Sequence, residues 1–431
     1  MIQSNISNYD MHQSNFESDY LSNTEIGASL DTDLILENES TEDNQITSNE
    51  TEPDSFALEA NSLTEGEGLD FVFNFDDNVP QEIRDKIGKA GEAWSAVISD
   101  DVTVQINVAY EFDIDGFANA NSETTEVAYS TLRQALSDNA TSKTDKTAIA
   151  NLPESETLNL LINNTKEIQG SDDVYLDDDG SANNSTIEIN TANAKALGLD
   201  AGENTVDATI TFEQAVNWDY DASDGLDGID FESIAIHEIG HALGFSASVD
   251  DLDEVAGLNL KQLIASENVD IEDIAEALAV EVESIEDILA TFGIENIKEI
   301  DPESFIKSIE DTPTEALLES IQPDQFASEN FYLPNTMDLF RYTDLSTDLG
   351  VSDFTVGKRD KYFSIDGGVT EIAPFSTGQF LGDGGQISHW EDDLGLGVMD
   401  PFYDFEAGEI GSISSNDLQL LDAIGWNTIV V

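Results

Sequence analysis

The sequence predicts an α+β domain, and three observations support that fold class. Aromatic and polar residues alternate between Gly68 and Asp77, which is typical of a strand with one buried face. A longer segment, residues 79–98, follows with apolar side chains at helical spacing. Further short alternating segments then lead to a second helical segment, residues 233–245. This order of strand, long helix, strands and helix predicts a sheet that packs against helices.

Local signals place each of these elements. Pro80 suits the first turn of the long helix, whose apolar stripe comprises Ile83, Ile87, Ala90 and Trp94. Alternation predicts further strands over residues 102–112, 157–163, 185–190 and 207–212. We expect a short helix over residues 191–199, between the last two of these strands.

The chain changes character after Asp250. Residues 256–325 are acidic, helical in pattern and weakly repetitive, with the tetrapeptide IEDI at Ile271 and again at Ile285. The repeat is too short to indicate a solenoid. We interpret this segment as an inserted acidic helical subdomain.

The last part of the chain is rich in glycine and aspartate and ends with a predicted helix over residues 414–426. Either Ser414 or Ser415 is its N-cap. Its apolar stripe comprises Leu418, Leu421 and Ile424.

The first part of the chain has a different composition. Residues 1–66 contain no lysine or arginine and are rich in Ser, Asn, Thr, Asp and Glu. Such a segment cannot bury enough apolar surface to offset the entropy of the chain. We therefore expect a disordered acidic leader, either a propeptide or a solvated tail, ahead of a folded domain over residues 67–431 that contains the insert.

The charge and composition limit the partners of this chain. Its 431 residues carry a formal net charge of −76, which repels nucleic acids and anionic membranes, so we expect neither as a partner. The absence of cysteine excludes disulfides, thiolate metal sites and a cysteine nucleophile. There is no apolar run of about 18 residues and no ordinary secretory signal. We predict a secreted or extracellular protein without a conventional signal peptide; a cytoplasmic location is the alternative.

The segment SIAIHEIGHALGF, residues 233–245, points to a metal. In a helix, His237 and His241 lie on one face, one turn apart, and can offer two ring nitrogens to one ion. Glu238 follows the first histidine and can hold a water. The motif H-E-x-x-H on a helix favours zinc with an open coordination position. The alternative is a chance match on an amphipathic helix, whose buried face would comprise Ile234, Ile239, Ala242 and Leu243.

A zinc hydrolase needs a third protein ligand. The compact pattern H-E-x-x-H-x-x-G-x-x-H places it six residues after the second histidine, where this chain has Ala247. Of the two remaining histidines, His12 lies in the leader, which leaves His389 in the segment SHWEDDLGLGVMDP. Asp250 is a rival third ligand, in which case His389 would be a surface histidine beside Trp390.

HEIGHALGF, followed far downstream by SHWEDDLGLGVMDP, resembles the leishmanolysin-type metzincins, and DLQLLDAIGW at residues 417–426 is similar to the last helix of predicted bacterial relatives. The resemblance implies a metzincin-like zincin domain with a twisted mixed sheet, an active-site helix, a methionine turn and a C-terminal helix. It implies zinc on His237, His241 and His389. It also implies Glu238 as the general base and Met399 as the turn methionine, for which core packing is the alternative role. Disulfides help to hold leishmanolysin, and this chain has none.

The function that this resemblance implies is that of a zinc metalloendopeptidase. Glu238 would take a proton from the zinc-bound water and return it to the leaving amine. We expect a monomer that acts on protein or peptide substrates. The alternatives are a catalytically inactive metzincin-fold protein that serves in binding or at the cell surface, and a zinc hydrolase with another substrate. Extended substrate could pair with an open sheet edge at residues 206–212, unless this is an ordinary paired strand.

Calcium is a further candidate cofactor. Residues 175–185 and 218–230 are acidic runs, and carboxylates are the oxygen ligands that this ion prefers. Neither run has glycine at the sixth and glutamate at the twelfth position of a helix-loop-helix calcium site. Solvated turns are the alternative interpretation of both runs.

Overall fold

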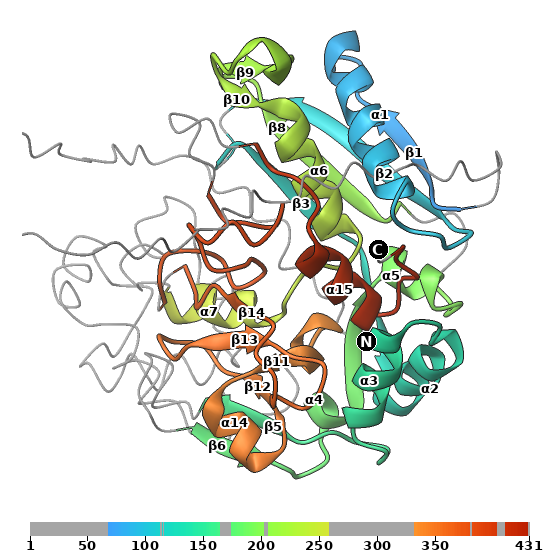
Figure 1. Cartoon of the computed structure of the whole chain (residues 1–431), viewed down its shortest axis with the longest axis vertical. Coiled ribbons are helices and arrows are strands. Elements are labelled where there is room, and N and C mark those ends of the chain that lie inside the picture. Colours follow the sequence, from blue (N-terminus) through green and yellow to red (C-terminus); the bar gives the residue numbers. More distant parts are fainter. Residues whose placement is uncertain are drawn as a thin grey trace, which may run out of the picture. The chain divides into compact units, whose positions relative to one another are not determined.

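The computed structural model describes residues 68–112, 114, 116–163, 174–201, 206–257, 332–379, 382–402 and 410–429 (Figure 1). The predicted leader lies outside these residues, and so does the predicted insert apart from its first two residues. None of the described helices combines the length and the apolar character needed to cross a lipid bilayer. Helices and strands are mixed throughout, which fits the predicted α+β class.

The largest sheet of the described chain has four strands in the order β1-β2-β8-β3. The first three are parallel and the last is antiparallel, so the sheet is mixed. Their bounds are Asp70–Phe75 for β1, Thr103–Glu111 for β2, Ala208–Glu213 for β8 and Ala118–Ser122 for β3. Parallel strands need a crossover, and helix α1, Gln81–Ser95, supplies the one between β1 and β2.

Of the two alternatives for residues 206–212, the ordinary paired strand is confirmed and the open sheet edge is wrong. Strand β8 pairs with β2 on one side and with β3 on the other, so its backbone groups are used on both sides. The strand at the edge beyond β8 is β3, whose sequence ANANS consists of alanine, asparagine and serine. Such residues have low β propensity, which is why the pattern along the chain gave no sign of this strand.

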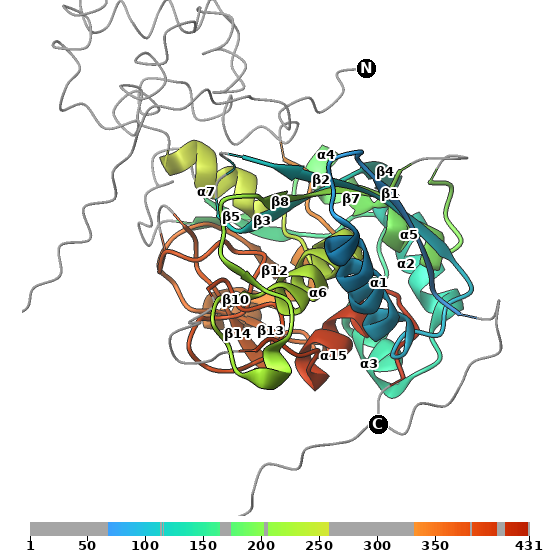
Figure 2. The same ribbon diagram turned by 90° about the horizontal axis from the view of Figure 1, so that it is seen from above.

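Helices α1 and α6 lie side by side against this sheet, as both views show (Figures 1 and 2). Helix α6 comprises Phe231–Ala242 and also contacts β3 and β8. Trp94 of α1 is fully buried, and its indole nitrogen donates a hydrogen bond to the carbonyl of Ile236 at 2.9 Å. The predicted stripe of α1 is therefore confirmed as its buried face, whose members include Ile83, Ile87, Ala90 and Trp94.

The remaining strands form small sheets. The pair β4 and β7 comprises Thr124–Ala128 and Thr186–Asn190, and the pair β9 and β10 comprises Trp218–Asp219 and Ile229–Asp230. The sheet β12-β5-β6 comprises Ser352–Phe354, Leu160–Asn163 and Val174–Asp177. The sheet β11-β13-β14 comprises Arg341–Tyr342, Lys361–Phe363 and Ala373–Phe375. The strands predicted over 157–163 and 185–190 are thus confirmed as β5 and β7.

Short helices complete the described structure. They are α2 (Tyr129–Asn139), α3 (Lys143–Asn151), α4 (Ala182–Ser185), α5 (Thr191–Ala196), α7 (Val249–Gly257), α14 (Asp344–Leu349) and α15 (Ser415–Ala423), with 3₁₀ turns at Ala222–Asp224 and Met337–Phe340. Helix α5 confirms the short helix predicted from residue 191. Helix α15 confirms the predicted C-terminal helix, and Ser414 is its N-cap because its side chain accepts from the backbone nitrogens of Asn416 and Asp417.

Candidate metal centre

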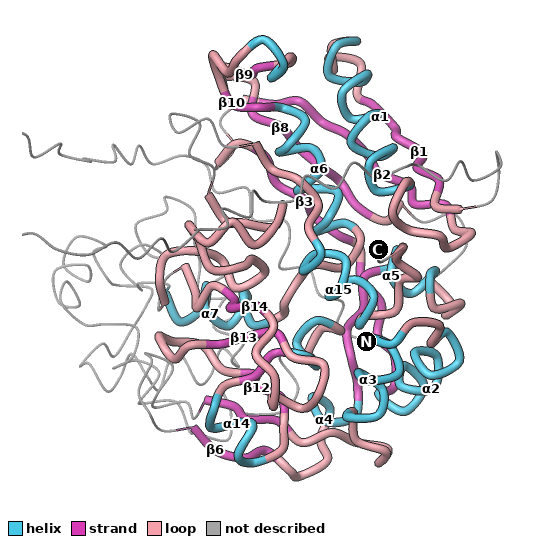
Figure 3. Tube along the Cα trace, in the orientation of Figure 1, coloured by secondary structure: helices cyan, strands magenta, loops and turns pink. Residues whose placement is uncertain are grey.

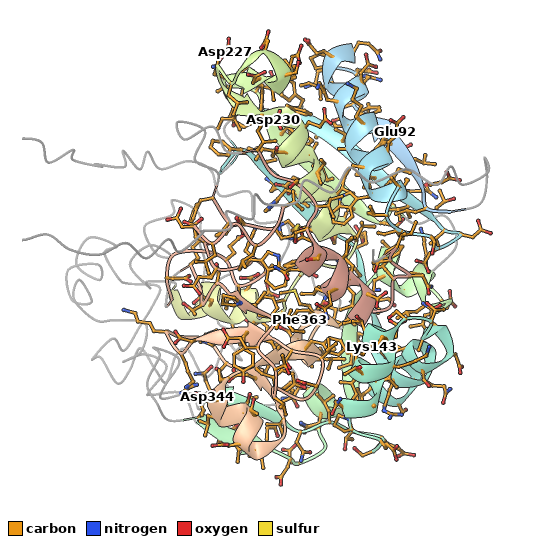
Figure 4. All side chains as sticks on the ribbon, in the orientation of Figure 1. Glu92, Lys143, Asp227, Asp230, Asp344 and Phe363 are labelled. Carbon is orange, nitrogen blue, oxygen red and sulfur yellow. The ribbon has the colours of Figure 1, made fainter. Side chains whose placement is uncertain are left out.

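Helix α6 begins at a side-chain cap. The carboxylate of Asp230 accepts a hydrogen bond from the backbone nitrogen of Ser233 at 2.9 Å, and Figure 4 shows Asp230 at this end of the helix. Glu232 in the first turn forms an ion pair with Lys86 at 2.9 Å. Both interactions fix the start of the helix. The two histidines that lie four residues apart therefore occupy successive turns of one helix face.

A glycine turn at the end of α6 holds the second histidine. Gly244 has φ +111°, a left-handed conformation that favours glycine. The turn brings the carbonyl oxygen of Phe245 to 2.6 Å from Nδ1 of His241. The turn after α6 thus orients the imidazole of His241, because the carbonyl oxygen of Phe245 contacts its ring nitrogen.

The third histidine comes from the far end of the chain. The segment between β14 and α15, which carries His389, is drawn mostly as loop in Figure 3. Nε2 of His389 lies 3.1 Å from Nε2 of His237 and 3.2 Å from Nε2 of His241. The Nε2 atoms of His237 and His241 are 3.1 Å apart. The structure therefore brings together the three histidines that the sequence analysis singled out as zinc ligands.

The other ring nitrogen of each histidine contacts a backbone carbonyl oxygen. Nδ1 of His237 lies 2.7 Å from the oxygen of Val398, and Nδ1 of His389 lies 3.2 Å from that of Gln386. His241 has the equivalent contact to Phe245. A carbonyl oxygen can only accept, so the proton belongs on Nδ1 in all three rings. Three Nε2 lone pairs then converge on one point, an arrangement that favours a cation.

The spacing and protonation of the cluster fit a zinc ion. Nitrogens about 2.0–2.1 Å from a tetrahedral zinc would lie roughly 3.3 Å from one another, close to the observed separations. Burial lowers the pKa of His237 to about 3 and that of His241 to about 4, and it holds the pKa of His389 well below its usual value. The imidazoles are therefore neutral at pH 7, as metal ligands must be.

Glu238 is buried next to this cluster on α6. Burial raises the pKa of its carboxyl to about 8. A cation beside it would favour the carboxylate and lower the pKa again. A buried acid with a perturbed pKa, directly after one histidine of such a cluster, is typical of a functional site.

The acidic residues considered as metal ligands have other partners. Asp250 accepts from the backbone nitrogens of Ile387 at 2.6 Å and Ser388 at 3.0 Å, so it lies outside the histidine cluster. In the two acidic runs, Asp177 accepts from Asn183 and Asp219 accepts from the backbone of Asp221. Within the described ranges, the three histidines are the one group of three or more His, Asp or Glu side chains placed to hold a metal. The structure therefore gives calcium no support.

Met399 packs beneath the histidine helix. Its side chain is fully buried, and a Cβ atom on Gly240 would lie 2.5 Å from its sulfur. The backbone oxygen of Met399 accepts from the nitrogen of Trp390 at 2.9 Å, which ties it to the residue after His389. The core-packing role of Met399 is thus confirmed, and its partner Gly240 lies between the two histidines of α6.

Substituting Gly240 by alanine is expected to destabilise the protein by about 1–3 kcal/mol, because the new methyl group would overlap the sulfur of Met399. The matched control is Gly88→Ala in α1, where no neighbouring atom lies within 4 Å of the new Cβ. There the higher helix propensity of alanine is expected to add about 0.8–1 kcal/mol of stability. Denaturant unfolding measures both changes. Equal stability of the two variants would show that Met399 does not pack as described.

Asp417 of α15 fixes the loop between His389 and Met399, and the sequence analysis missed this role. Its carboxylate accepts from the indole nitrogen of Trp390 at 2.8 Å and from the backbone nitrogen of Val398 at 3.0 Å. The carbonyl of Val398 in turn contacts His237. Ser414 followed by Asp417 is a recognisable capping pattern, but nothing in that pattern predicts the two distant partners.

Comparison with known proteins found a match to one protein-family model. The matrixin (Peptidase M10) model matches residues 179–256, a minority of the chain that includes α6 but not His389. No match was found among curated proteins or among solved structures. Matrixins are zinc metallopeptidases, and the cluster of two buried histidines and the half-buried His241 could hold their metal. The match therefore supports a metzincin-type zinc metalloprotease family for this chain, whereas the leishmanolysin-like variant stays a prediction.

Proposed function

We propose that this protein is a zinc metalloendopeptidase that hydrolyses peptide bonds in protein substrates. The observation that carries the proposal is the convergence of three Nε2 atoms, 3.1–3.2 Å apart, from two distant parts of the chain. His237, His241 and His389 would hold the zinc ion. When bound, zinc would supply Lewis acidity that polarises the scissile carbonyl and acidifies water. The match to the matrixin family supports the same metal and reaction class.

Glu238 is the proposed general base. It accepts a proton from the attacking water and donates it to the departing amine nitrogen. Met399 is the proposed turn methionine, which gives the histidine helix an apolar floor through its contact with Gly240. A buried floor fixes the helix turn between the two histidines, so their imidazoles keep one orientation.

The proposed substrate-binding edge is strand β3. Within the described residues β3 pairs with β8 alone, which leaves its other edge available to an extended peptide. Ser122 at the end of β3 donates from Oγ to the carbonyl oxygen of His241 at 3.4 Å. A peptide paired with β3 would therefore run beside the metal centre. Secretion and a monomeric state stay predictions.

Metal removal tests this function. The full chain is expected to cleave casein, to lose nearly all of that activity after treatment with 1,10-phenanthroline, and to regain it with one equivalent of zinc but not of magnesium. Mass spectrometry of the products would show internal peptide bonds broken. One equivalent of bound zinc without any peptide cleavage would instead favour the inactive binding protein. Cleavage at the same rate in the presence of the chelator would contradict the metal mechanism.

A further inference from the structure

One carboxylate from another part of the chain holds the loop in front of His389. Asp250 accepts from the backbone nitrogen of Ile387 at 2.6 Å and from that of Ser388 at 3.0 Å. It also accepts a hydrogen bond from Oγ of Ser388. Hydrogen bonds to an ionised acceptor are stronger than neutral ones. All three donors lie in the two residues that directly precede His389.

The same loop is held from a second direction. The backbone nitrogen of Ala247 donates to Oγ of Ser388 at 3.3 Å, so the hydroxyl bridges Ala247 and Asp250. Ala247 is the residue that stands where the compact zinc pattern has its third histidine. Residues 247–250 therefore contribute no ligand themselves, but they hold the loop that brings the distant ligand into that position.

The support behind Asp250 is itself fixed. Asp250 lies in the first turn of α7, and its backbone nitrogen donates to the carbonyl of Ala247 at 3.1 Å. Just ahead of α7, the backbone nitrogen of Ser248 donates to the buried carboxylate of Asp338 at 3.0 Å. That carboxylate also accepts from the backbone nitrogen of Asn335 at 2.8 Å. The position of Asp250 is thus determined by the fold and not by an exposed loop.

We propose that Asp250 is a positioning residue for the third metal ligand, acting through Ile387 and Ser388 on His389. The proposal rests on the proposed metal site but not on the peptidase reaction. With its two preceding peptide units fixed, His389 can place Nε2 near the other two histidines while Nδ1 contacts Gln386. Without the hydrogen bonds to Asp250, the loop would have to become ordered each time the ion binds, and the affinity for the ion would be lower.

The test compares Asp250→Ala, Asp250→Asn and Ser388→Ala with Asp251→Asn, an exposed neighbour on the same helix that serves as the matched control. Competition with a chromogenic chelator measures zinc affinity. We expect Asp250→Ala to weaken binding by about 10–100-fold, as loss of an outer partner of a ligand typically does. Asp250→Asn and Ser388→Ala should lose less, because each keeps part of the hydrogen bonding. Asp251→Asn should bind zinc as the wild type does.

Two further readouts separate positioning from general stability. The visible spectrum of the cobalt-substituted protein should change in Asp250→Ala, because the third imidazole is less well oriented. In the metal-free protein, hydrogen exchange of residues 386–390 should speed up while that of α6 stays the same. If Asp250→Ala does not fold, the same measurements on Ser388→Ala test the proposal, because this variant keeps the two backbone hydrogen bonds to Asp250.

Unchanged zinc affinity in a folded Asp250→Ala, or affinity equally weak in every form including the wild type, would overturn the proposal. Faster exchange with unchanged affinity would overturn it too, since Asp250 would then support only the loop. A wild-type chain that binds zinc but cleaves no peptide would contradict the peptidase function and leave this test intact.

Discussion

Glu238→Gln is expected to lower kcat/KM for casein or a peptide substrate by about 10³-fold, within the 10²–10⁴-fold that a positioned general base contributes. The amide has nearly the same shape as the carboxyl but cannot accept the proton of the attacking water at neutral pH. Zinc should stay bound with one equivalent per chain, because the three histidines are unchanged. Initial rates and metal analysis on the same sample measure both properties.

The control is Glu232→Gln, the same chemical change six residues earlier on α6. Glu232 lies in the first turn of α6, five residues before His237, and its carboxylate pairs with Lys86. A partly exposed ion pair of this kind contributes about 0–1 kcal/mol. Its rate should therefore stay close to that of the wild type. Equal activity of wild type and Glu238→Gln would remove Glu238 from the mechanism and with it the assignment of this reaction.

His389→Ala is expected to weaken zinc binding by more than about 100-fold, since even outer partners of metal ligands account for 10–100-fold. Peptide cleavage should fall with the bound metal. Two imidazoles on one helix would remain, and they cannot complete a catalytic site with three protein ligands. Chelator competition and zinc stoichiometry measure the loss, with His389→Asn as a second variant that keeps more of the buried volume.

His12→Ala is the matched control, because His12 is the one other histidine in the chain and lies outside the described residues. It should retain the zinc and the activity of the wild type. If His389→Ala kept one tightly bound zinc, another side chain would have to supply the third ligand. If His12→Ala lost its zinc, the third ligand would come from His12 in the leader and not from His389.

Local signals were enough to predict helix α6 and its two histidines. The spacing of His237 and His241 determines their common face, and the prediction needs no knowledge of the rest of the fold. The stripe of α1 was predictable for the same reason, and the N-cap of α15 was narrowed to Ser414 or Ser415. His389 was singled out differently, by elimination among four histidines and by the resemblance, because no local pattern can tell how a distant loop folds back.

Other features depend on contacts between residues far apart in the sequence, so local sequence patterns could not predict them. Strand β3 has a sequence of weak β propensity, and only its pairing with β8 makes it a strand. Asp250 was considered a rival ligand because it is a carboxylate near the histidines in sequence. Its actual partners, the backbone nitrogens of Ile387 and Ser388, belong to a loop more than a hundred residues away and leave no trace in the local sequence.

The hold of Asp417 on Trp390 and Val398 affects when the centre can form. Until α15 docks, the loop with the third histidine lacks its carboxylate partner. A partly synthesised chain that includes Met399 but not yet α15 holds all three histidines and still lacks Asp417. The centre is therefore expected to form only after α15 has folded against the loop.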